Sequence, residues 1–287
     1  MNLLKLKDFT QEIDKLVDIL NRKFCIIPKL GIELEFYLRD RNNKLVTAAE
    51  IKRFKEKLEE SNIILTEEKG ADQFETQINH TSNILKLLSK INTTKSCLVL
   101  VAEKLNLKVL FNPKPFKNDY GSSMHFHLSL HDQKERNIFS EESINTNELL
   151  NSVISAILLM LNPSLYFFCE DMLEEYDRFT PNFMAPVNVS WGGNNRTTAI
   201  RIPESNIYNR RIEFRVPSAL WDPQKIIFFL LLASIDGIKH TRYPIGRTYG
   251  NAADTQYQLI KLHNTPSSAK EDYILDEICD KILNKVL

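Results

Sequence analysis

The sequence predicts an α+β fold in which helices pack on one side of a mostly antiparallel sheet. Two patterns support this prediction. Several short segments alternate apolar and polar residues with the period of two that is typical of strands, and longer segments between them carry apolar residues at helical spacing. The 287 residues contain no internal repeat, no low-complexity segment and no linker rich in glycine or serine, so we expect one large domain.

The predicted elements begin with an amphipathic helix over residues 8–23, which we interpret as a packed leader helix. The segment IPKLGIELEFYL then alternates as a strand does, and Thr47 with Glu50 forms the capping box of a second helix. The remaining predictions are strands at 73–78, 107–111 and 121–130, helices at 83–105 and at 147–160 (ended by Asn162 and Pro163), strands in TTAIRIP and RRIEFRVP, and a helix from Pro223 to about Lys239.

Composition excludes several classes of partner. Lysine plus arginine equals aspartate plus glutamate at 37 each, so no surplus of positive charge favours nucleic acid or an anionic membrane, and a small-molecule or protein partner is expected instead. The four cysteines form no CxxC pair, which indicates reduced thiols and gives no zinc spacing. No secretory leader opens the chain, and the longest apolar run, IIFFLLLASI, is about half of the ~20 residues that cross a bilayer. We therefore expect a cytoplasmic protein.

Four of the predicted strands carry unusual polar side chains opposite their apolar face. For any single strand a solvated outer face is the simpler interpretation. Solvated faces usually mix lysine, threonine and serine, however, whereas here glutamate and histidine prevail, and these are ligands for divalent cations. If the strands are neighbours, their polar faces form one concave site. The side chains that share a face are Glu33 with Glu35, Gln73 with Glu75 and Gln77, His125 with His127 and Ser129, and Arg211 with Glu213 and Arg215.

Two metal ions at such a site would also account for Arg211 and Arg215. Phosphoryl transfer requires cations that neutralise charge on the transferred group, and guanidinium groups bind phosphate or carboxylate through two parallel hydrogen bonds. The alternative interpretation is a structural ion network in which both arginines pair with Glu213.

Six motifs, in order from about Gly31 to Lys239, resemble the catalytic domain of glutamine synthetase and of its relatives, the γ-glutamyl-amine ligases. GIELEF is similar to the family's ExE strand, EKGADQFE to its E-x(3)-GQ-x-E segment, and PKP followed by GSSMHFHLSL to its ATP-binding stretch. NNRTTAIRIP and RIEFR resemble the paired arginine motifs, and ASIDGI the helix that follows. The resemblance implies a curved, mostly antiparallel sheet that forms a funnel, with a leader helix at 1–24 and the catalytic domain at 25–287.

The resemblance also implies roles for the matching residues. Glu35, Glu68 and Glu75 would hold the metal ion nearer the amino-acid substrate, and Glu33, His125 and Glu213 the ion that bridges the ATP phosphates. His127, Ser129 and Arg211 would line the ATP site. Arg178, Gly121 and Arg215 would bind the substrate, and Arg196, Arg201 and Arg215 would be catalytic. The implied cofactors are Mg²⁺ or Mn²⁺ at two sites, with ATP as co-substrate.

The implied activity is that of an ATP-dependent carboxylate–amine ligase, which phosphorylates the γ-carboxylate of glutamate and transfers the γ-glutamyl group to an amine. The family's flap reads YEAP, but this chain has FMAP, with Met184 in place of the acid, and WGGNNR is similar to the WGxxNR of amine ligases. Both features favour an organic amine over ammonia. The alternatives are a glutamine synthetase that uses ammonia and an inactive relative that acts as a scaffold or regulator.

The chain also departs from the family pattern. Tyr120 and Ser123 replace asparagine and glycine, WDPQK replaces NPY, and Asp72 replaces a glycine, so we expect the backbone at Asp72 to avoid positive φ. The family's N-terminal β-grasp domain, which completes the neighbouring subunit's site, is expected to be absent. Two assemblies are therefore possible: a homo-oligomer, or a complex with a partner chain that supplies this domain.

Overall fold

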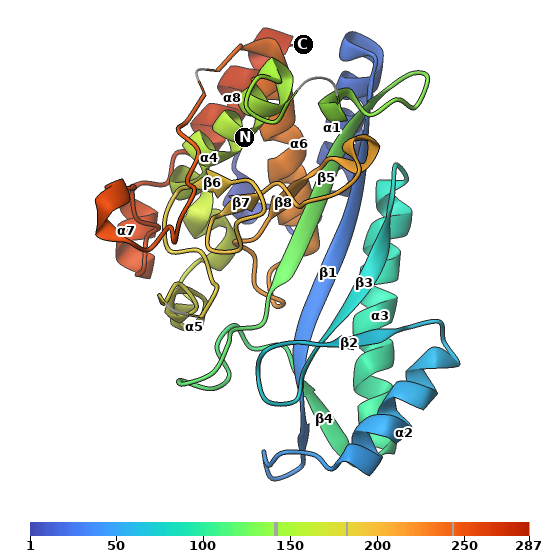
Figure 1. Cartoon of the computed structure of the whole chain (residues 1–287). Helices are drawn as coiled ribbons and strands as arrows, with labels where there is room; N and C mark the ends of the chain where they lie inside the picture. The colour runs from blue at the N-terminus through green and yellow to red at the C-terminus, as the bar shows by residue number, and fades with distance from the viewer. Residues whose placement is uncertain (141–142, 182, 243, 287) are drawn as a thin grey trace.

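An open sheet of eight strands organises the structure, a computed structural model that describes residues 1–140, 143–181, 183–242 and 244–286 (Figure 1). Its strands pair in the order β2-β3-β1-β5-β8-β7-β6, and β4 also pairs with β1. Within the described ranges only the pair β6–β7 is parallel. The strands are β1 (Ile26–Asp40), β2 (Leu65–Glu67), β3 (Gln73–Thr81), β4 (Leu107–Leu110), β5 (Met124–Asp132), β6 (Trp191–Gly192), β7 (Ile200–Arg201) and β8 (Ile212–Phe214).

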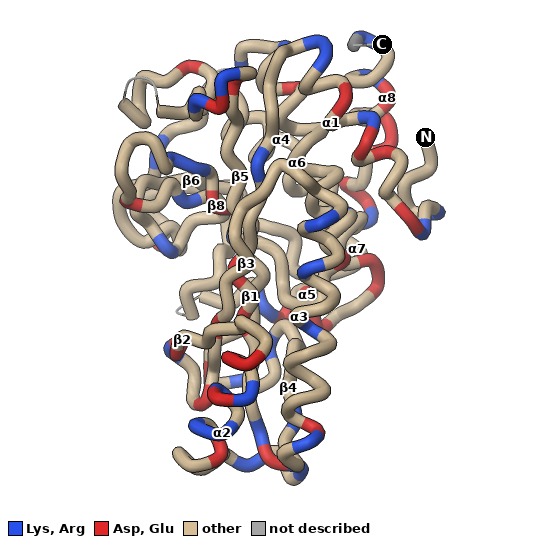
Figure 2. The backbone as a smooth tube through the Cα atoms, turned by 90° about the vertical axis from the view of Figure 1, so that its right-hand side faces the viewer, with Lys and Arg blue, Asp and Glu red and all other residues tan. Residues whose placement is uncertain are grey.

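The helices lie on one side of the long strands. Figure 2 shows α1, α3 and α6 to the right of β1, β3 and β5, and α1 and α3 both contact β1. The predicted α+β class and the mostly antiparallel sheet are therefore confirmed. The helices are α1 (Thr10–Phe24), α2 (Ala48–Glu59), α3 (Ile84–Lys104), α4 (Glu148–Cys169), α5 (Leu173–Asp177), α6 (Pro223–Lys239), α7 (Pro266–Glu271) and α8 (Leu275–Val286), with short 3₁₀ turns at Leu3–Lys5, Ile138–Ser140, Ile207–Asn209 and Thr255–Tyr257.

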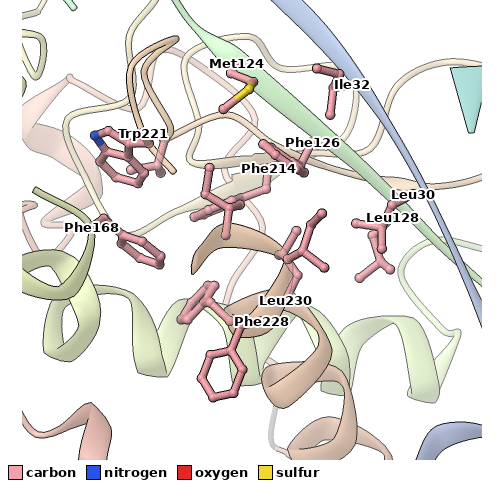
Figure 3. Packing of buried hydrophobic residues seen from close by; sticks show 14 of the residues in the cluster. Leu30, Ile32, Met124, Phe126, Leu128, Phe168, Phe214, Trp221, Phe228 and Leu230 are labelled. Atoms are coloured by element: carbon pink, nitrogen blue, oxygen red, sulfur yellow. The ribbon is translucent and has the colours of Figure 1, made fainter. Parts of the chain in front are cut away.

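The core fills the space between the apolar face of the sheet and the helices. Phe126 and Leu128 of β5 and Phe214 of β8 point toward α6, which carries Phe228 (Figure 3). All four side chains are fully buried. Because each buried side chain of this size contributes about 1.5–3 kcal/mol, this face fixes the sheet against α6 and leaves the opposite face free for polar groups.

Helix α4 is longer than the sequence predicts. The pattern placed its end at Asn162 and Pro163, but the helix continues to Cys169 with Pro163 inside it. The residues after the proline, including Phe167 and Phe168, are buried against the core, and this burial outweighs the cost of about 3 kcal/mol for an internal proline. By length and composition α4 is apolar enough to cross a membrane, but 89% of that window is buried inside the fold, as in a core helix.

The strands predicted in TTAIRIP and RRIEFRVP are present but short, because β7 and β8 have two and three residues. Pro203 and Pro217 follow them, and proline has no N–H to donate to a ladder. The capping box is confirmed: Thr47 Oγ1 accepts a hydrogen bond from the Glu50 N–H, and Glu50 in turn accepts one from the Thr47 N–H.

The expectation for Asp72 was wrong, because its φ is 53°, in the left-handed region. Its carbonyl accepts a hydrogen bond from the Leu38 N–H at 3.0 Å, and its carboxylate accepts one from the Val46 N–H at 2.9 Å. The carboxylate also lies 3.6 Å from Arg39. Aspartate tolerates the left-handed conformation better than most residues, and these contacts offset the strain that remains.

Lys95 of α3 holds its ammonium group against the loop that contains Ala219, whose carbonyl accepts a hydrogen bond from Nζ at 2.6 Å. Burial lowers the pKa of Lys95 from 10.5 to about 8, although Asp222 and Glu175 act in the opposite direction. Between these two pH values the unfolded chain binds more protons than the folded one. The contribution of Lys95 to stability therefore rises as the pH increases through this window.

We expect Lys95→Met to increase the free energy of unfolding at pH 7 by about 1–2 kcal/mol, because it removes a charge that burial disfavours. In the wild type, Lys95 adds to the rise in the free energy of unfolding between pH 8 and 10.5, and the variant should lack this addition. Urea unfolding across this range measures both effects. Lys90→Met, on an exposed position of the same helix, is the control. Identical pH profiles for the wild type and Lys95→Met would contradict the interpretation.

Candidate active site

The four strands with polar faces are neighbours, in the order β3-β1-β5-β8. Their registers bring the polar side chains opposite one another: Glu35 pairs with Glu75, and Glu33 pairs with His125. His127 of β5 pairs in turn with Glu213 of β8. Since directly opposed residues on adjacent strands point to the same face, these side chains form one continuous polar surface. The concave site expected from the separate strands is therefore assembled by the sheet.

The first cluster consists of Glu35, Glu68 and Glu75, whose ligand oxygens all lie within 4.8 Å of one another. Burial raises the pKa of Glu75, and the charges of Glu33 and Glu35 raise it further. Burial also raises the pKa of Glu68, with Glu35 adding to the effect. Among the described residues no lysine or arginine forms an ion pair with this cluster. Three converging carboxylates, none of them in an ion pair with lysine or arginine among the described residues, fit a divalent metal ion.

The backbone and a neighbouring amide orient this cluster. Glu35 Oε2 accepts a hydrogen bond from the Ser123 N–H at 2.9 Å and another from Gln73 Nε2 at 3.4 Å. The Glu68 N–H donates to the Gln73 carbonyl at 2.9 Å, which positions the loop between β2 and β3 beside the sheet. Oriented ligands of this kind lose little freedom when a cation binds.

The second cluster joins Glu33, His125 and Glu75, again with ligand atoms within 4.8 Å. His125 Nδ1 lies 3.3 Å from Glu33 Oε2, and His127 Nε2 lies 3.0 Å from Glu33 Oε1. Burial opposes ionisation of Glu33, but its contacts with His125 and His127 and their charges outweigh it and hold the pKa of Glu33 well below its usual range. The buried Nε2 of His125 has no hydrogen-bond partner among the described residues, so this donor set also fits a metal ion.

Glu213, predicted as the third ligand of this cluster, binds two arginines. It is fully buried, and its carboxylate accepts hydrogen bonds from Arg201 Nη1 at 2.7 Å and from Arg215 Nη1. Burial opposes ionisation of Glu213, but Arg215, His125 and Arg201 together outweigh it and keep the pKa of this carboxyl below its usual value. Glu213 Oε1 still lies 3.7 Å from His125 Nδ1, at the border of the cluster. The structure thus places Glu75 within the cluster and Glu213 beside it.

The residues predicted to bind ATP line a cavity of about 440 Å³ on this face. His127, Ser129 and Arg211 are all in its wall, together with Glu33, and Arg211 Nε donates to His127 Nδ1 at 3.0 Å. His131 was missed, although it continues the alternation of β5 by one more step and its Nε2 lies 3.0 Å from Ser129 Oγ. The period-two pattern that selected the other β5 residues would have found it.

The residues predicted to bind the amino-acid substrate line a second cavity, of about 40 Å³, next to the first cluster. Arg178, Gly121, Arg196 and Arg215 are all in its wall. At Gly121 a Cβ would lie 2.6 Å from the Pro113 carbonyl, so only glycine fits there. Arg201 is separate from this wall, since its guanidinium binds Asn194 and Glu213.

Arg178 is almost fully buried, and other groups of the chain already bind its guanidinium. Its guanidinium donates to the Val216 carbonyl, to Ser123 Oγ at 2.6 Å and to the Arg215 carbonyl at 3.1 Å. Burial lowers the pKa of Arg178 to about 10, so the group stays cationic at neutral pH. Ser123, a departure from the family pattern, thus supplies a direct acceptor for Arg178.

Trp221, in the WDPQK segment that replaces the family's NPY, has a structural role. Trp221 stacks on Phe168 with ring centroids 4.8 Å apart, and its Nε1–H donates to Glu175 Oε2 at 2.9 Å. Glu175 is buried three residues before Arg178. The tryptophan therefore ties the helix that carries Arg178 to the core.

Comparison with known proteins decides the family. The family model described as "Glutamine synthetase, catalytic domain" matches residues 47–286. This chain belongs to the glutamine synthetase family. The predicted resemblance is confirmed, with a match that extends beyond Lys239 to residue 286, and Glu33 and Glu35 of β1 lie just before its start.

Two curated relatives illustrate the range of the family. The γ-glutamylputrescine synthetase PuuA of Escherichia coli K12 is 31% identical over 173 residues, which are 60% of this chain and 36% of the relative. The glutamine synthetase of Methanocaldococcus jannaschii is 30% identical over 211 residues, which are 71% of this chain and 46% of the relative. The chain therefore spans roughly a third to a half of the length of the glutamine synthetase family members it matches.

A solved structure supports the fold. The "GmaS/ADP complex" superimposes with a TM-score of 0.78 at 19% identity, covering 96% of this chain and 69% of that one. At this identity the likeness establishes the fold alone.

Proposed function

We propose that this chain catalyses the ATP-dependent joining of the γ-carboxylate of glutamate to an amine. The observation that carries the proposal is the position of the two carboxylate clusters, which share Glu75 on one sheet face. The larger cavity, which contains His127 and Arg211, lies on one side of the clusters. The smaller, arginine-lined cavity, with Arg178, Arg196 and Arg215 in its wall, lies on the other side. Phosphoryl transfer from ATP to a carboxylate needs this arrangement, with cations between two anionic substrates.

The residues of the chain position both substrates. Mg²⁺ or Mn²⁺ ions held by the clusters would neutralise charge on the phosphates when bound. Ser129 and Arg211 would bind ATP in the larger cavity, and Arg178 and Arg215 the α-carboxylate of glutamate in the smaller one. Glu213 holds Arg201 and Arg215 in place through its two hydrogen bonds.

Arg196, Arg201 and Arg215 would stabilise the phosphoryl group as it moves. A γ-carboxylate oxygen attacks the terminal phosphorus of ATP, and ADP leaves with the electrons of the broken P–O bond. The product is an acyl phosphate whose phosphate can depart. Fixed guanidinium groups favour this step because their charge is already oriented where negative charge develops.

The acceptor amine is proposed to be organic. Met184 lines the same cavity as Glu68 and Arg196. The apolar surface of its thioether side chain favours a carbon chain over ammonium. The glutamine synthetases among the relatives support ammonia as the second candidate.

Release of phosphate by the purified chain tests the proposal. We expect release with ATP, Mg²⁺ or Mn²⁺ and glutamate to increase when a suitable amine is added, and Glu75→Gln to remove the signal. Phosphate release that does not depend on glutamate would contradict the assignment of the acid substrate. Binding of ATP without release under any of these conditions would favour the inactive relative that acts as a scaffold or regulator.

Arg178→Ala should raise the KM for glutamate by about tenfold to a hundredfold, because a hydrogen-bonded charge contributes about 1.5–3 kcal/mol to binding. The KM for ATP should change much less, since Arg178 lines only the smaller cavity. Steady-state kinetics with each substrate varied in turn measures both constants, and thermal unfolding checks that the variant is folded. Equal changes in the two constants would exclude a substrate-specific role.

A further inference from the structure

The arginine-lined cavity has an apolar wall. Tyr120, Phe183, Met184 and Ala185 line it. The rings of Tyr120 and Phe183 meet edge to face, with centroids 5.8 Å apart and an interplanar angle of 88°. Met184 is 38% exposed, and its φ of 58° lies in the left-handed region, which strains the backbone of a methionine. Its side chain forms part of this wall. An aliphatic chain would find van der Waals contact here.

A lysine of the chain lies over each of the two aromatic rings. Lys114 Nζ lies 3.5 Å from the centroid of the Phe183 ring and donates to the Asp119 carbonyl at 2.5 Å. Lys69 Nζ lies 6.0 Å from the centroid of the Tyr120 ring. An aromatic ring attracts an ammonium group through its face, so these lysines compete with a ligand cation for the rings.

The charged groups in the wall of this cavity also disfavour a second ligand cation. The described lining residues include two carboxylates, Glu35 and Glu68, and both belong to the first metal cluster. Four cations line the same cavity, namely Lys69, Arg178, Arg196 and Arg215. No carboxylate of the described lining is therefore left over to pair with a distal ammonium group.

We propose, on the basis of the ligase function above, that the acceptor is a primary monoamine with a short uncharged aliphatic chain. A diamine would bring its second ammonium against Lys69, which lines the cavity. Ammonium would gain nothing from the apolar wall and would meet Met184 where the family has an acid. The wall thus selects for the carbon chain, and Lys69 selects against further charge.

The transfer step balances with the neutral amine as nucleophile. The nitrogen lone pair attacks the γ-carbonyl carbon of the acyl phosphate, and the bond between this carbon and the phosphate oxygen breaks. The phosphate leaves with the electron pair of that bond and takes one proton from the nitrogen. The products are a γ-glutamyl alkylamide and hydrogen phosphate.

A matched pair of amines tests the inference. n-Butylamine and 1,4-diaminobutane have the same carbon chain and differ in the second ammonium group. We expect kcat/KM for n-butylamine to exceed that for 1,4-diaminobutane by about tenfold or more, because like charges brought together at a binding site are strongly disfavoured. Ammonium should also be a poorer acceptor than n-butylamine. Glutamate-dependent amide formation, measured by mass spectrometry, identifies the product in each case.

Variants of the wall sharpen the test. Lys69→Met should reduce the ratio between the two amines, whereas Lys69→Arg should preserve it because the charge is retained. Met184→Glu should shift preference toward 1,4-diaminobutane and ammonium. If the wild-type chain forms glutamate-dependent product but prefers the diamine or ammonium, the monoamine inference is overturned and the ligase stands. If no amine yields product, both proposals are overturned.

Discussion

Glu75→Gln should lower turnover by about a hundredfold or more and leave the metal-free protein at least as stable as the wild type. Glu75 is the carboxylate that both clusters share, so its loss removes a ligand from each. In the metal-free protein, the same carboxylate faces Glu33 and Glu35, whose charges oppose its ionisation. Glutamine keeps the hydrogen bond from Gln77 and relieves this repulsion. Phosphate release, Mn²⁺ titration calorimetry and thermal unfolding in EDTA measure the three effects.

Glu67→Gln is the matched control, because Glu67 is an exposed carboxylate on β2 that pairs with Lys55 outside the clusters. This variant should retain both Mn²⁺ binding and turnover, since exposed ion pairs contribute little. A Glu75→Gln protein that turned over normally but was less stable in EDTA would show that Glu75 is structural.

Glu213→Gln should have the opposite effect on stability. Glu213 is fully buried between Arg201 and Arg215, and its charge compensates both. Breaking a buried ion pair by removing one partner's charge costs about 3–5 kcal/mol, and the hydrogen bonds that glutamine retains reduce this cost to about 2–4 kcal/mol. Turnover should fall as well, because the two arginines lose the group that orients them. Urea unfolding and phosphate release measure these losses.

Glu204→Gln serves as the control for this variant, since Glu204 is an exposed carboxylate on the segment between β7 and β8. It should change the free energy of unfolding by less than about 0.5 kcal/mol. If Glu213→Gln were as stable as the wild type, the charge of Glu213 would not be needed to hold the arginines, and its assignment beside the metal cluster would have to be revised.

The sequence predicted the polar face well because a strand has an exact period. Once β1 and β5 are recognised, alternation alone places Glu33, Glu35, His125 and His127 on the same side of each strand. The order of the strands in the sheet is not encoded in any local pattern. The structure supplies this order as β3-β1-β5-β8.

What the sequence could not predict depends on contacts between distant residues. The continuation of α4 beyond Pro163 depends on core packing that outweighs a local signal. The left-handed backbone of Asp72 depends on partners from β1 and the following loop. The two ion pairs of Glu213 depend on which arginines reach it in space. Spacing along the chain records none of these.

The fate of the γ-carboxylate oxygen tests the central claim most directly. If the chain activates glutamate as an acyl phosphate, glutamate labelled with ¹⁸O in the γ-carboxylate should transfer one labelled oxygen to each phosphate released in the presence of ATP, Mg²⁺ and n-butylamine. This transfer follows because the carbon–oxygen bond breaks when the amine attacks. Phosphate that carries no label would show that water, and not glutamate, accepts the phosphoryl group, and would contradict the account.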